Sequence, residues 1–149
     1  MEIRLATVRS RSAKGSPADA LVQEYGGRIA HSAGFAPVSY ATEEKLLAGE
    51  AAAGRGRRVL VLLDSRGKAM SSDAFATWLR RQREDGAAIL AFCIGPPDGW
   101  SDAARNRADL LLSLGPMTLP HQLAAAVLAE QIYRAFTIIE GHPYHLGHG

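Results

Sequence analysis

The chain has 149 residues, of which 47% are hydrophobic, and its formal net charge at pH 7 is +2. A chain of this length can bury one hydrophobic core and has the usual size of one domain, so we expect a single domain over residues 1–149. The longest apolar runs, such as VLVLL at residues 59–63, are far shorter than the roughly 20 residues that cross a membrane. The N-terminus also lacks a signal-peptide pattern. The sequence therefore argues against a membrane protein and predicts a cytoplasmic one.

The basic residues are unevenly spaced along the chain, which suits a polyanionic partner. The alternative is that they lie on solvated helix faces and loop ends, as most basic runs do. The clustered positions are Arg4, Arg9, Arg11 and Lys14, then Arg55, Arg57 and Arg58, and then Arg80, Arg81 and Arg83. The single cysteine, Cys93, cannot form an internal disulfide or a zinc cage of cysteines, and its apolar neighbours predict a buried small side chain.

Strand-like stretches alternate with helical ones through the first part of the chain. Residues 2–8 predict a strand, residues 17–32 a helix with proline in its first turn, and residues 36–41 a second strand. Thr42 is a favourable N-cap and two acidic residues follow it. Residues 42–53 therefore predict another helix.

The middle of the chain continues the alternation. Residues 49–58 (GEAAAGRGRR) are predicted to form the flexible loop of the chain. Residues 58–64 (RVLVLLD) are apolar almost throughout, which is typical of a strand covered on both faces, and we predict a central place in the sheet for it. Serine and aspartate residues suited to capping then begin a helix over residues 71–85, which Gly86 ends.

The last part of the chain completes the pattern. Residues 87–95 and 108–115 predict two further buried strands, with a short helix over residues 101–107 between them. Residues 119–140 carry apolar side chains at helical spacing, over a face wide enough to be buried on more than one side. Strands separated by helices predict an α/β fold with a mainly parallel sheet and helices on both faces.

Three stretches at predicted strand ends are candidates for a ligand site: LDSRGK (63–68), IGPPDGW (94–100) and LSLGPMTLPH (112–121). In open parallel sheets, ligands bind beyond the carboxyl ends of the strands, where loops meet helix N-termini. Glycine lets the backbone approach a ligand closely, although each stretch alone also fits an ordinary surface turn. The glycine-rich dinucleotide fingerprint and the P-loop signature are both absent from the sequence, so those two nucleotide sites have no support.

Five segments together carry a family resemblance: LDSRGKAMSSDAFA, FCIGPPDGWSD, ADLLLSLGPMTLPHQL, LAEQIYRA and GHPYH. In this order and spacing they closely resemble the RlmH family. That family consists of SPOUT-class methyltransferases, which use S-adenosylmethionine to methylate N3 of a pseudouridine in large-subunit ribosomal RNA. The resemblance runs from about Val59 to His145, whereas the first 55 residues fit the family only in the order of their strands and helices.

The resemblance implies a deep trefoil knot, in which the C-terminal stretch threads through a loop of the sheet. It also implies a homodimer whose paired subunits complete the RNA-facing site. The implied cofactor is S-adenosylmethionine, held in a pocket made by the three stretches at the strand ends, largely through backbone groups. The implied cofactor-binding residues are Leu63, Gly95, Pro96, Gly115, Pro116, Met117, Thr118, Leu119 and Pro120.

Three histidines, His142, His145 and His148, fall three residues apart in the final segment GHPYHLGHG. A zinc site at this spacing would need a helical turn, which Pro143 and the flanking glycines oppose, and further ligands. We therefore predict no metal site, and we assign His148 to a loose chain end. The resemblance places PYH beside the methyl donor, which makes Tyr144 and His145 candidates for handling the substrate.

The implied reaction needs a base and a cationic or hydrogen-bonding partner, because an imide N3 attacks a methyl sulfonium well only as its proton leaves. On this basis His145 would take the proton, Tyr144 would orient the base, and Arg134 would stabilise the developing charge. Two positions have a plainer alternative. Arg134 follows Glu130 by four residues, the spacing of a helix ion pair. His121, near the start of the last helix, would cap or pack there.

Three positions depart from the family's pattern. Pro96 replaces the second of two glycines and has no N–H to donate, while Ala125 and Leu146 stand where the family usually carries cations. The leading interpretation is an S-adenosylmethionine-dependent ribosomal RNA pseudouridine N3-methyltransferase. One alternative is a catalytically weakened relative that still binds ribosomal RNA or the cofactor. The other is a SPOUT methyltransferase with a different RNA target, such as tRNA.

Overall fold

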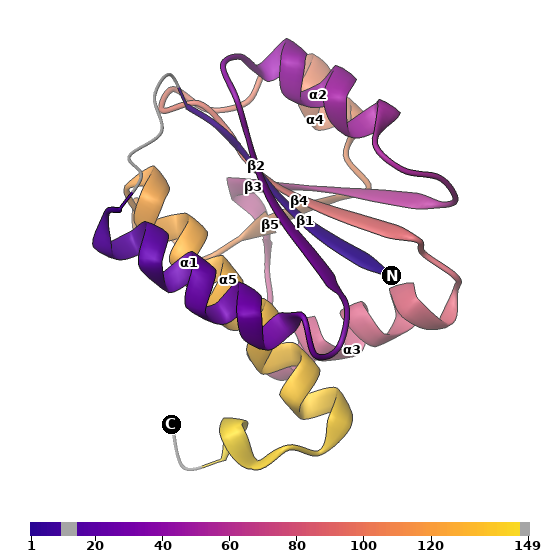
Figure 1. Ribbon diagram of the computed structural model, residues 1–149. Helices are drawn as coiled ribbons and strands as arrows, with labels where there is room; N and C mark the ends of the chain where they lie inside the picture. Colours follow the sequence, from indigo (N-terminus) through magenta and orange to yellow (C-terminus); the bar gives the residue numbers. More distant parts are fainter. Residues whose placement is uncertain (10–14, 147–149) are drawn as a thin grey trace.

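A five-stranded sheet lies at the centre of the fold (Figure 1). The computed structural model describes residues 1–9 and 15–146. Every strand pairing is parallel, and the strands lie in the order β2-β1-β4-β3-β5. The strands are β1 (Glu2–Val8), β2 (Gly34–Tyr40), β3 (Arg58–Ala69), β4 (Ile89–Ile94) and β5 (Leu110–Ser113). The predicted parallel sheet is confirmed.

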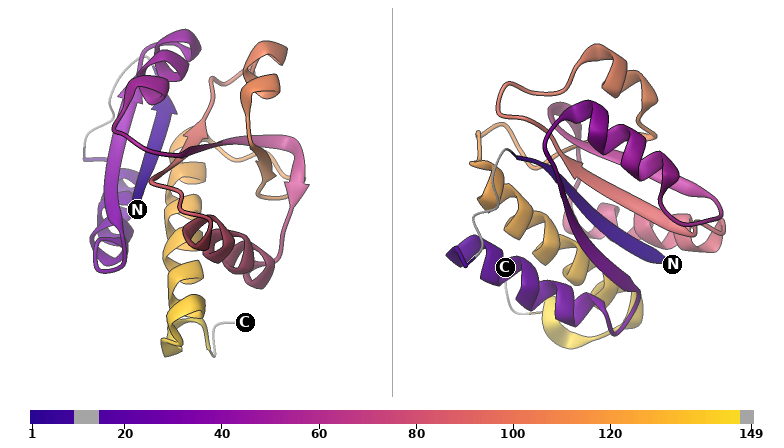
Figure 2. Two further views of the ribbon diagram at one scale, coloured as in Figure 1. Left: turned by 90° about the vertical axis from the view of Figure 1, so that its right-hand side faces the viewer. Right: turned by 45° about the horizontal axis from the view of Figure 1, so that its top comes forward.

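Helices cover both faces of this sheet, as predicted (Figure 2). Helices α1, α3 and α5 pack on one face, and α2 and α4 pack on the other. Their bounds are α1 (Pro17–Ile29), α2 (Glu43–Ala52), α3 (Ser72–Glu84), α4 (Asp102–Arg107) and α5 (His121–Glu140), followed by the short 3₁₀ turn η1 (Pro143–His145). Within the described residues, no helix is long and apolar enough to cross a membrane.

Side-chain caps define where four helices begin. Ser16, Thr42, Ser71 and Ser101 each accept a hydrogen bond from the backbone N–H three residues further on, at the starts of α1, α2, α3 and α4. Such caps satisfy N–H groups that have no partner inside the helix. The predicted caps at Thr42 and at the start of the helix over 71–85 are therefore confirmed.

Strand β4 is the middle strand of the sheet, and all six of its residues are buried. The strand predicted as central over residues 58–64, β3, lies inside the sheet between β4 and the edge strand β5, one place from the middle. Cys93 is fully buried in β4, which confirms its predicted packing role. Burial raises the pKa of its thiol far above the ordinary value, because desolvation disfavours the thiolate.

The structure contradicts the flexible loop predicted for residues 49–58. Residues 49–52 form the last turn of α2. Arg58 fastens the turn that follows, since its guanidinium donates hydrogen bonds to the carbonyl oxygens of Glu50 at 2.8 Å and Gly54 at 3.1 Å, and to that of Ala53. Glycine and alanine content suggested a mobile segment, but an arginine from the next strand supplies the missing hydrogen bonds.

A buried carboxylate joins α2 to the edge of the sheet. Glu50 is 4% exposed and accepts hydrogen bonds from Arg4 Nε at 2.8 Å, Arg4 Nη2 at 3.1 Å and Tyr40 Oη at 2.6 Å. Arg4 is thus committed to an internal ion pair, so it does not belong with the cations available to a polyanion. A buried charge needs such partners to offset its desolvation.

We expect Glu50→Ala to lower the free energy of unfolding by about 3 kcal/mol, because Arg4 and Tyr40 would lose their buried hydrogen-bond acceptor and Arg4 would keep only the more exposed carboxylate of Glu2, 3.0 Å from its Nη1. Urea denaturation followed by circular dichroism measures the change. Glu44→Ala, which removes an exposed carboxylate from the same helix, is the matched control and should shift stability by less than about 0.5 kcal/mol. Equal effects of the two substitutions would contradict a structural role for the Glu50 ion pair.

Candidate functional site

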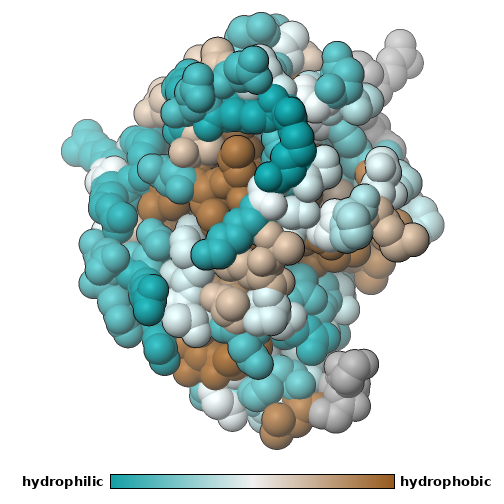
Figure 3. All heavy atoms as spheres, turned by 180° about the vertical axis from the view of Figure 1, so that it is seen from behind, coloured by the Kyte–Doolittle hydropathy of each residue, from teal (hydrophilic) through white to brown (hydrophobic). Residues whose placement is uncertain are grey.

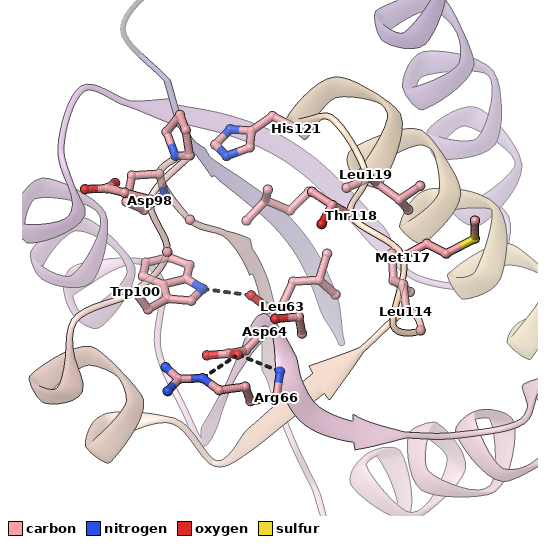
Figure 4. Close-up of a pocket in the computed structure, with 18 of the residues that line it drawn as sticks. Leu63, Asp64, Arg66, Asp98, Trp100, Leu114, Met117, Thr118, Leu119 and His121 are labelled. Carbon is pink, nitrogen blue, oxygen red and sulfur yellow. Dashed lines mark hydrogen bonds and ion pairs between the residues drawn. The ribbon is translucent and has the colours of Figure 1, made fainter.

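A cavity of about 380 Å³ lies beside residues 63–66 of β3 and the carboxyl ends of β4 and β5 (Figure 4). All three stretches singled out in the sequence contribute to its wall: residues 63–66, 94–100 and 114–121. Ligand pockets of cofactor size have volumes in this range and favour this edge of a parallel sheet. The structure thus has a cavity of suitable size at the predicted place of the site.

Most of the implied cofactor-binding residues meet at this cavity. Met117 is 84% exposed and lies at its rim. Pro116 and Pro120 belong to the same loop but are not among the lining residues. The predicted residues that line the cavity are Leu63, Gly95, Pro96, Gly115, Met117, Thr118 and Leu119.

The first stretch, predicted as a loop, is instead a bulge within β3. Leu63 and Lys68 both lie opposite Leu112 of β5, so residues 64–67 form an extra loop of chain between them. A Cβ atom on Gly67 would lie 2.6 Å from the carbonyl carbon and oxygen of Leu111, a contact that the backbone cannot relieve. Glycine is therefore required at position 67, and the bulge carries Asp64 and its neighbours to the cavity.

Trp100 is a wall residue that the sequence did not single out. Its indole Nε1 donates a 2.9 Å hydrogen bond to the carbonyl oxygen of Leu63. A Cβ atom on Gly95 would lie only 2.6 Å from the indole ring. The ring thus packs directly against the Gly95 backbone and ties the second stretch to the end of β3. The only sequence signal was the pairing of glycine and tryptophan within IGPPDGW.

An ion pair that the sequence also missed lies beside Trp100. The side chain of Asp64 is 5% exposed, and one of its oxygens accepts a 2.6 Å hydrogen bond from Arg105 Nε of α4. Its other oxygen accepts a 2.8 Å hydrogen bond from the backbone N–H of Arg66, whose Nε lies 3.8 Å away. Asp64 is thus held by cations on two sides, which fixes α4 against the bulge of β3.

Glycine also shapes the third stretch. Gly115 has φ of 123°, a conformation that side chains with a Cβ rarely adopt. Ser113 stabilises this turn, because its Oγ accepts a 3.1 Å hydrogen bond from the Gly115 N–H and donates to the Gly115 carbonyl oxygen at 3.2 Å. The turn leaves backbone edges along the cavity wall without side chains in the way.

These walls fit the cofactor that the family resemblance implies. S-adenosylmethionine combines an adenosine with an amino acid that carries both charges, and its recognition needs close backbone approach and groups of both signs. The Gly115 backbone allows such an approach, and the Gly95 backbone lines the same cavity with the Trp100 ring packed against it. Asp64, Arg66 and Arg105 provide charges of both signs along the same cavity.

The three departures from the family pattern have distinct surroundings. Pro96 starts a tight turn, in which its carbonyl oxygen accepts a 2.9 Å hydrogen bond from the N–H of Gly99, and Gly99 has φ of 89°. Ala125 is buried in α5, so its methyl group packs within this chain. Leu146 is 62% exposed beyond η1. Pro96 therefore affects the cavity wall, Ala125 the core and Leu146 the tail.

His121 is the first residue of α5, and its side chain lines the cavity (Figure 4). The predicted capping role is wrong. The N-cap position is Pro120, and no side-chain cap bond forms at this helix end within the described residues. The imidazole instead faces the cavity formed by the three strand ends.

The three predicted catalytic residues lie toward the far end of α5. The helix has 20 residues, so at 1.5 Å per residue it separates His121 from the terminal turn by about 30 Å. Tyr144 and His145 are in η1, and Arg134 lies in the last two turns of α5. Within one chain, the structure does not bring these three residues to the cavity.

Tyr144 packs into an aromatic and cationic cluster between α1 and α5. Its ring centroid is 4.6 Å from that of Tyr133, and the Arg28 guanidinium lies 5.4 Å from Tyr133 and 5.9 Å from Tyr144. Burial, together with a hydrogen bond with Tyr25, raises the pKa of Tyr144 to about 12. Its phenol is therefore neutral at physiological pH, which suits orientation of a substrate rather than proton removal.

Arg134 forms the helix ion pair with Glu130 that was the alternative to a catalytic role. Its Nε donates a 2.8 Å hydrogen bond to Glu130 across one helical turn, and this bond raises the pKa of its guanidinium. The same guanidinium lies 5.2 Å from the centre of the Tyr144 ring, a cation–π contact that holds the terminal turn. Arg134 thus acts on the tail through Tyr144.

The tail histidines are arranged differently from one another. His142 Nδ1 accepts a 3.1 Å hydrogen bond from the backbone N–H of Tyr144. His145 Nδ1 is buried without a hydrogen-bond partner among the described residues. The third histidine, His148, lies outside the described residues, as do Arg11 and Lys14. Across residues 1–9 and 15–146, no group of three His, Cys, Asp or Glu side chains could hold a metal ion.

Comparison with known sequences places these features in a family. A family model described as predicted SPOUT methyltransferase matches residues 1–145. A protein of Koribacter versatilis named ribosomal RNA large subunit methyltransferase H is 42% identical over 146 residues, which are 98% of this chain and all of that relative. A protein of the same name from Brucella ovis is 56% identical over 90 residues, which cover 60% of this chain and 53% of that relative.

Solved structures with a similar fold are much more distant in sequence. A probable methylase family protein from Haemophilus influenzae superposes with a TM-score of 0.54 at 10% identity, covering 97% of this chain and 68% of that one. The SpoU methyltransferase AviRb from Streptomyces viridochromogenes, solved with AdoMet, gives a TM-score of 0.48 at 16% identity, with coverages of 89% and 56%. The family match over residues 1–145 and the near-complete match to the Koribacter versatilis protein lead to one assignment. The chain belongs to the SPOUT methyltransferase family.

Proposed function

We propose that this protein transfers a methyl group from S-adenosylmethionine to N3 of a pseudouridine in large-subunit ribosomal RNA. The main observation behind this proposal is the cavity at the strand ends, whose walls are built from the same three stretches that carry the family resemblance. The near-complete match to a ribosomal RNA large subunit methyltransferase H supports the choice of RNA. We place the reaction in the cytoplasm, where ribosomes are made, and assign it to a single methyltransferase domain.

Residues of the three stretches would hold the methyl donor. Backbone groups of Leu63, Gly95 and the loop over 115–120 line or flank the cavity and suit the adenosine. The charged groups beside Trp100 suit the amino-acid end. Bound S-adenosylmethionine supplies a methyl group made electrophilic by the sulfonium.

The pseudouridine must lose the N3 proton as N3 attacks, and negative charge then collects on the two neighbouring carbonyl oxygens. A proton acceptor and a hydrogen-bond donor near these atoms accelerate such a reaction. Tyr144 is a neutral phenol and suits the donor role. Two histidines are available as acceptors, His145 in the terminal turn and His121 in the cavity.

We propose that the terminal turn acts in the cavity of a second subunit. The separation of about 30 Å along α5 keeps Tyr144 and His145 away from the cavity of their own chain. A homodimer with α5 in its interface would bring the two together. Support comes from Met117 and Leu123, which are 84% and 44% exposed near the start of that helix. Isolated apolar side chains are common on surfaces, but large ones beside a functional site suit an interface.

The surface is consistent with such an assembly. The face opposite to that of Figure 1 shows apolar atoms gathered in hollows between hydrophilic side chains (Figure 3). A symmetric dimer buries the same patch on both subunits. We also propose the deep trefoil knot, in which the segment that leads into α5 threads through a loop of the sheet. The position of this segment beside the ends of three strands supports it.

Mass spectrometry of ribosomal RNA tests the proposed activity. A strain that lacks the protein should lose a methylated pseudouridine from its large-subunit RNA, and expression of the protein should restore it. An unchanged set of modified nucleosides would contradict the proposal. Loss of a modification from tRNA instead would favour a SPOUT methyltransferase with a different target.

A weakened relative that binds RNA or cofactor without turnover is the second candidate. Pro96, which has no N–H at the cavity wall, and Leu146, which places no cation on the tail, motivate it. Calorimetric titration with S-adenosylmethionine, followed by a turnover assay, separates the candidates. Binding without turnover on large ribosomal subunits would favour the weakened relative.

A further inference from the structure

We propose that His121 is the catalytic residue that accepts the N3 proton. This inference rests on the proposed function and assigns one of its steps to a residue of the cavity's own chain. His121 is the first residue of α5 and its imidazole faces the cavity, as Figure 4 shows. It lies on the loop-to-helix segment that follows the predicted cofactor-binding residues directly in the sequence.

The other titratable groups of the cavity are committed or badly placed. They are Asp64, Arg66, Asp98 and Arg105. Asp64 forms an ion pair with Arg105 at 2.6 Å. It also accepts a hydrogen bond from the backbone N–H of Arg66, so both of its carboxylate oxygens are occupied. The two arginines are cations and accept no proton.

The remaining carboxylate, that of Asp98, belongs to an exposed residue and points away from Leu63 and Leu119 in Figure 4. His121 makes no side-chain hydrogen bond with any of the described residues, whereas Asp64 makes several. A neutral imidazole has one ring nitrogen that accepts a proton. Among the described residues that line the cavity, His121 is therefore the one titratable group that combines a free lone pair with a position facing it.

The proton and electron balance of the step is simple. The N3 lone pair of the pseudouridine forms the new bond to the methyl group, while the methyl–sulfur bond breaks and leaves its electron pair on sulfur. The N3 proton passes to the imidazole of His121, which becomes an imidazolium and later loses the proton to water. The positive charge carried in on the sulfonium thus leaves on the histidine.

The first test measures single-turnover methyl transfer to large ribosomal subunits by His121→Asn. Asparagine keeps a polar side chain of similar reach but does not act as a base near neutral pH. We expect the rate to fall by roughly 10²-fold or more, the usual size of a general-base effect. The affinity for S-adenosylmethionine, measured by calorimetry, should stay within about threefold, since a group that acts only in the reaction leaves ground-state binding unchanged.

The pH dependence provides a readout that a packing role would not change. The wild-type rate should rise as the imidazole deprotonates and then level off, and His121→Asn should lack this titration. His31→Asn is the matched control, because His31 is exposed at the end of α1, away from the cavity, and it should keep both the rate and the titration. If His145→Asn removes the titration and His121→Asn does not, the proton acceptor is the tail histidine and our inference is wrong.

A measurement without turnover separates this inference from the proposed function. The imidazole proton resonances of His121, identified by their loss in His121→Asn, should shift in NMR spectra when S-adenosylhomocysteine is added. A wild-type protein that methylates no RNA would refute the proposed function. Unmoved His121 resonances on saturation with S-adenosylhomocysteine, or an Asn variant with more than about a third of the wild-type rate, would refute the role of His121.

Discussion

Removal of residues 144–149 will abolish methyl transfer to the large ribosomal subunit while leaving the affinity for S-adenosylmethionine nearly unchanged. The deletion takes away Tyr144 and His145, and none of the residues that it removes from the described part of the chain, 144–146, lines the cavity. It also takes few core contacts, because no residue of η1 is buried. A rate assay with labelled S-adenosylmethionine and calorimetry on the same preparation measure the two effects.

Two controls make the truncation decisive. Deletion of His148 and Gly149 alone, which lie outside the described residues, should leave the rate unchanged. Mixed dimers of the truncated chain with a chain that cannot bind the methyl donor should recover part of the activity, because one intact cavity would then meet one intact tail. Full activity of the truncated chain would remove the tail from the mechanism. An absence of recovery in mixed dimers would contradict action across the subunit interface.

Gly95→Ala will weaken S-adenosylmethionine binding by roughly 10-fold to 100-fold. The new Cβ would lie 2.6 Å from the Trp100 indole, so the ring must shift, which disturbs the wall of the cavity and the 2.9 Å hydrogen bond from the indole to the Leu63 carbonyl oxygen. Overpacking of this kind costs about 1–3 kcal/mol, and about 1.4 kcal/mol corresponds to a tenfold change in affinity. Calorimetry measures the loss directly.

Gly27→Ala is the matched control for that substitution. Gly27 lies in α1 and a Cβ there would meet nothing within 4 Å, so cofactor affinity should stay at the wild-type value. Intrinsic fluorescence provides a second readout, since the chain has only two tryptophans and one of them, Trp100, lines the cavity. Wild-type affinity in Gly95→Ala would show that Trp100 can move without disturbing the site.

Local patterns predicted much of the fold. Residues 2–8 form β1 with the predicted bounds, and Thr42 caps α2 as expected. Such features depend on side chains a few residues apart, and their physical cause lies within the segment itself. The predicted place of the cavity also followed from local information, since the ends of parallel strands meet at one edge of a sheet.

The remaining features depend on contacts between distant segments. The bulge of β3 exists because Gly67 must pass close to the backbone of Leu111, a neighbour from another strand. Asp64 and Arg105 are 41 residues apart, and Trp100 and Leu63 are 37 apart. No periodicity within one stretch contains such information.

The predicted catalytic residues and the predicted cofactor-binding residues are separated by the length of a helix. Sequence order places the PH pair at the start of α5 and the PYH turn after its end. The helix between them is rigid and spans about 30 Å. One chain therefore holds the tail residues away from the cavity, and the second subunit that we propose would bring them to it.

Transfer of labelled methyl groups to purified large ribosomal subunits tests the proposed function most directly. The subunits come from a strain that lacks the protein, and the product RNA is digested to nucleosides and analysed by mass spectrometry. We expect the label to appear in a single nucleoside, N3-methylpseudouridine, only when both the protein and S-adenosylmethionine are present. No transfer to these subunits, or label in any other nucleoside, would contradict the assignment.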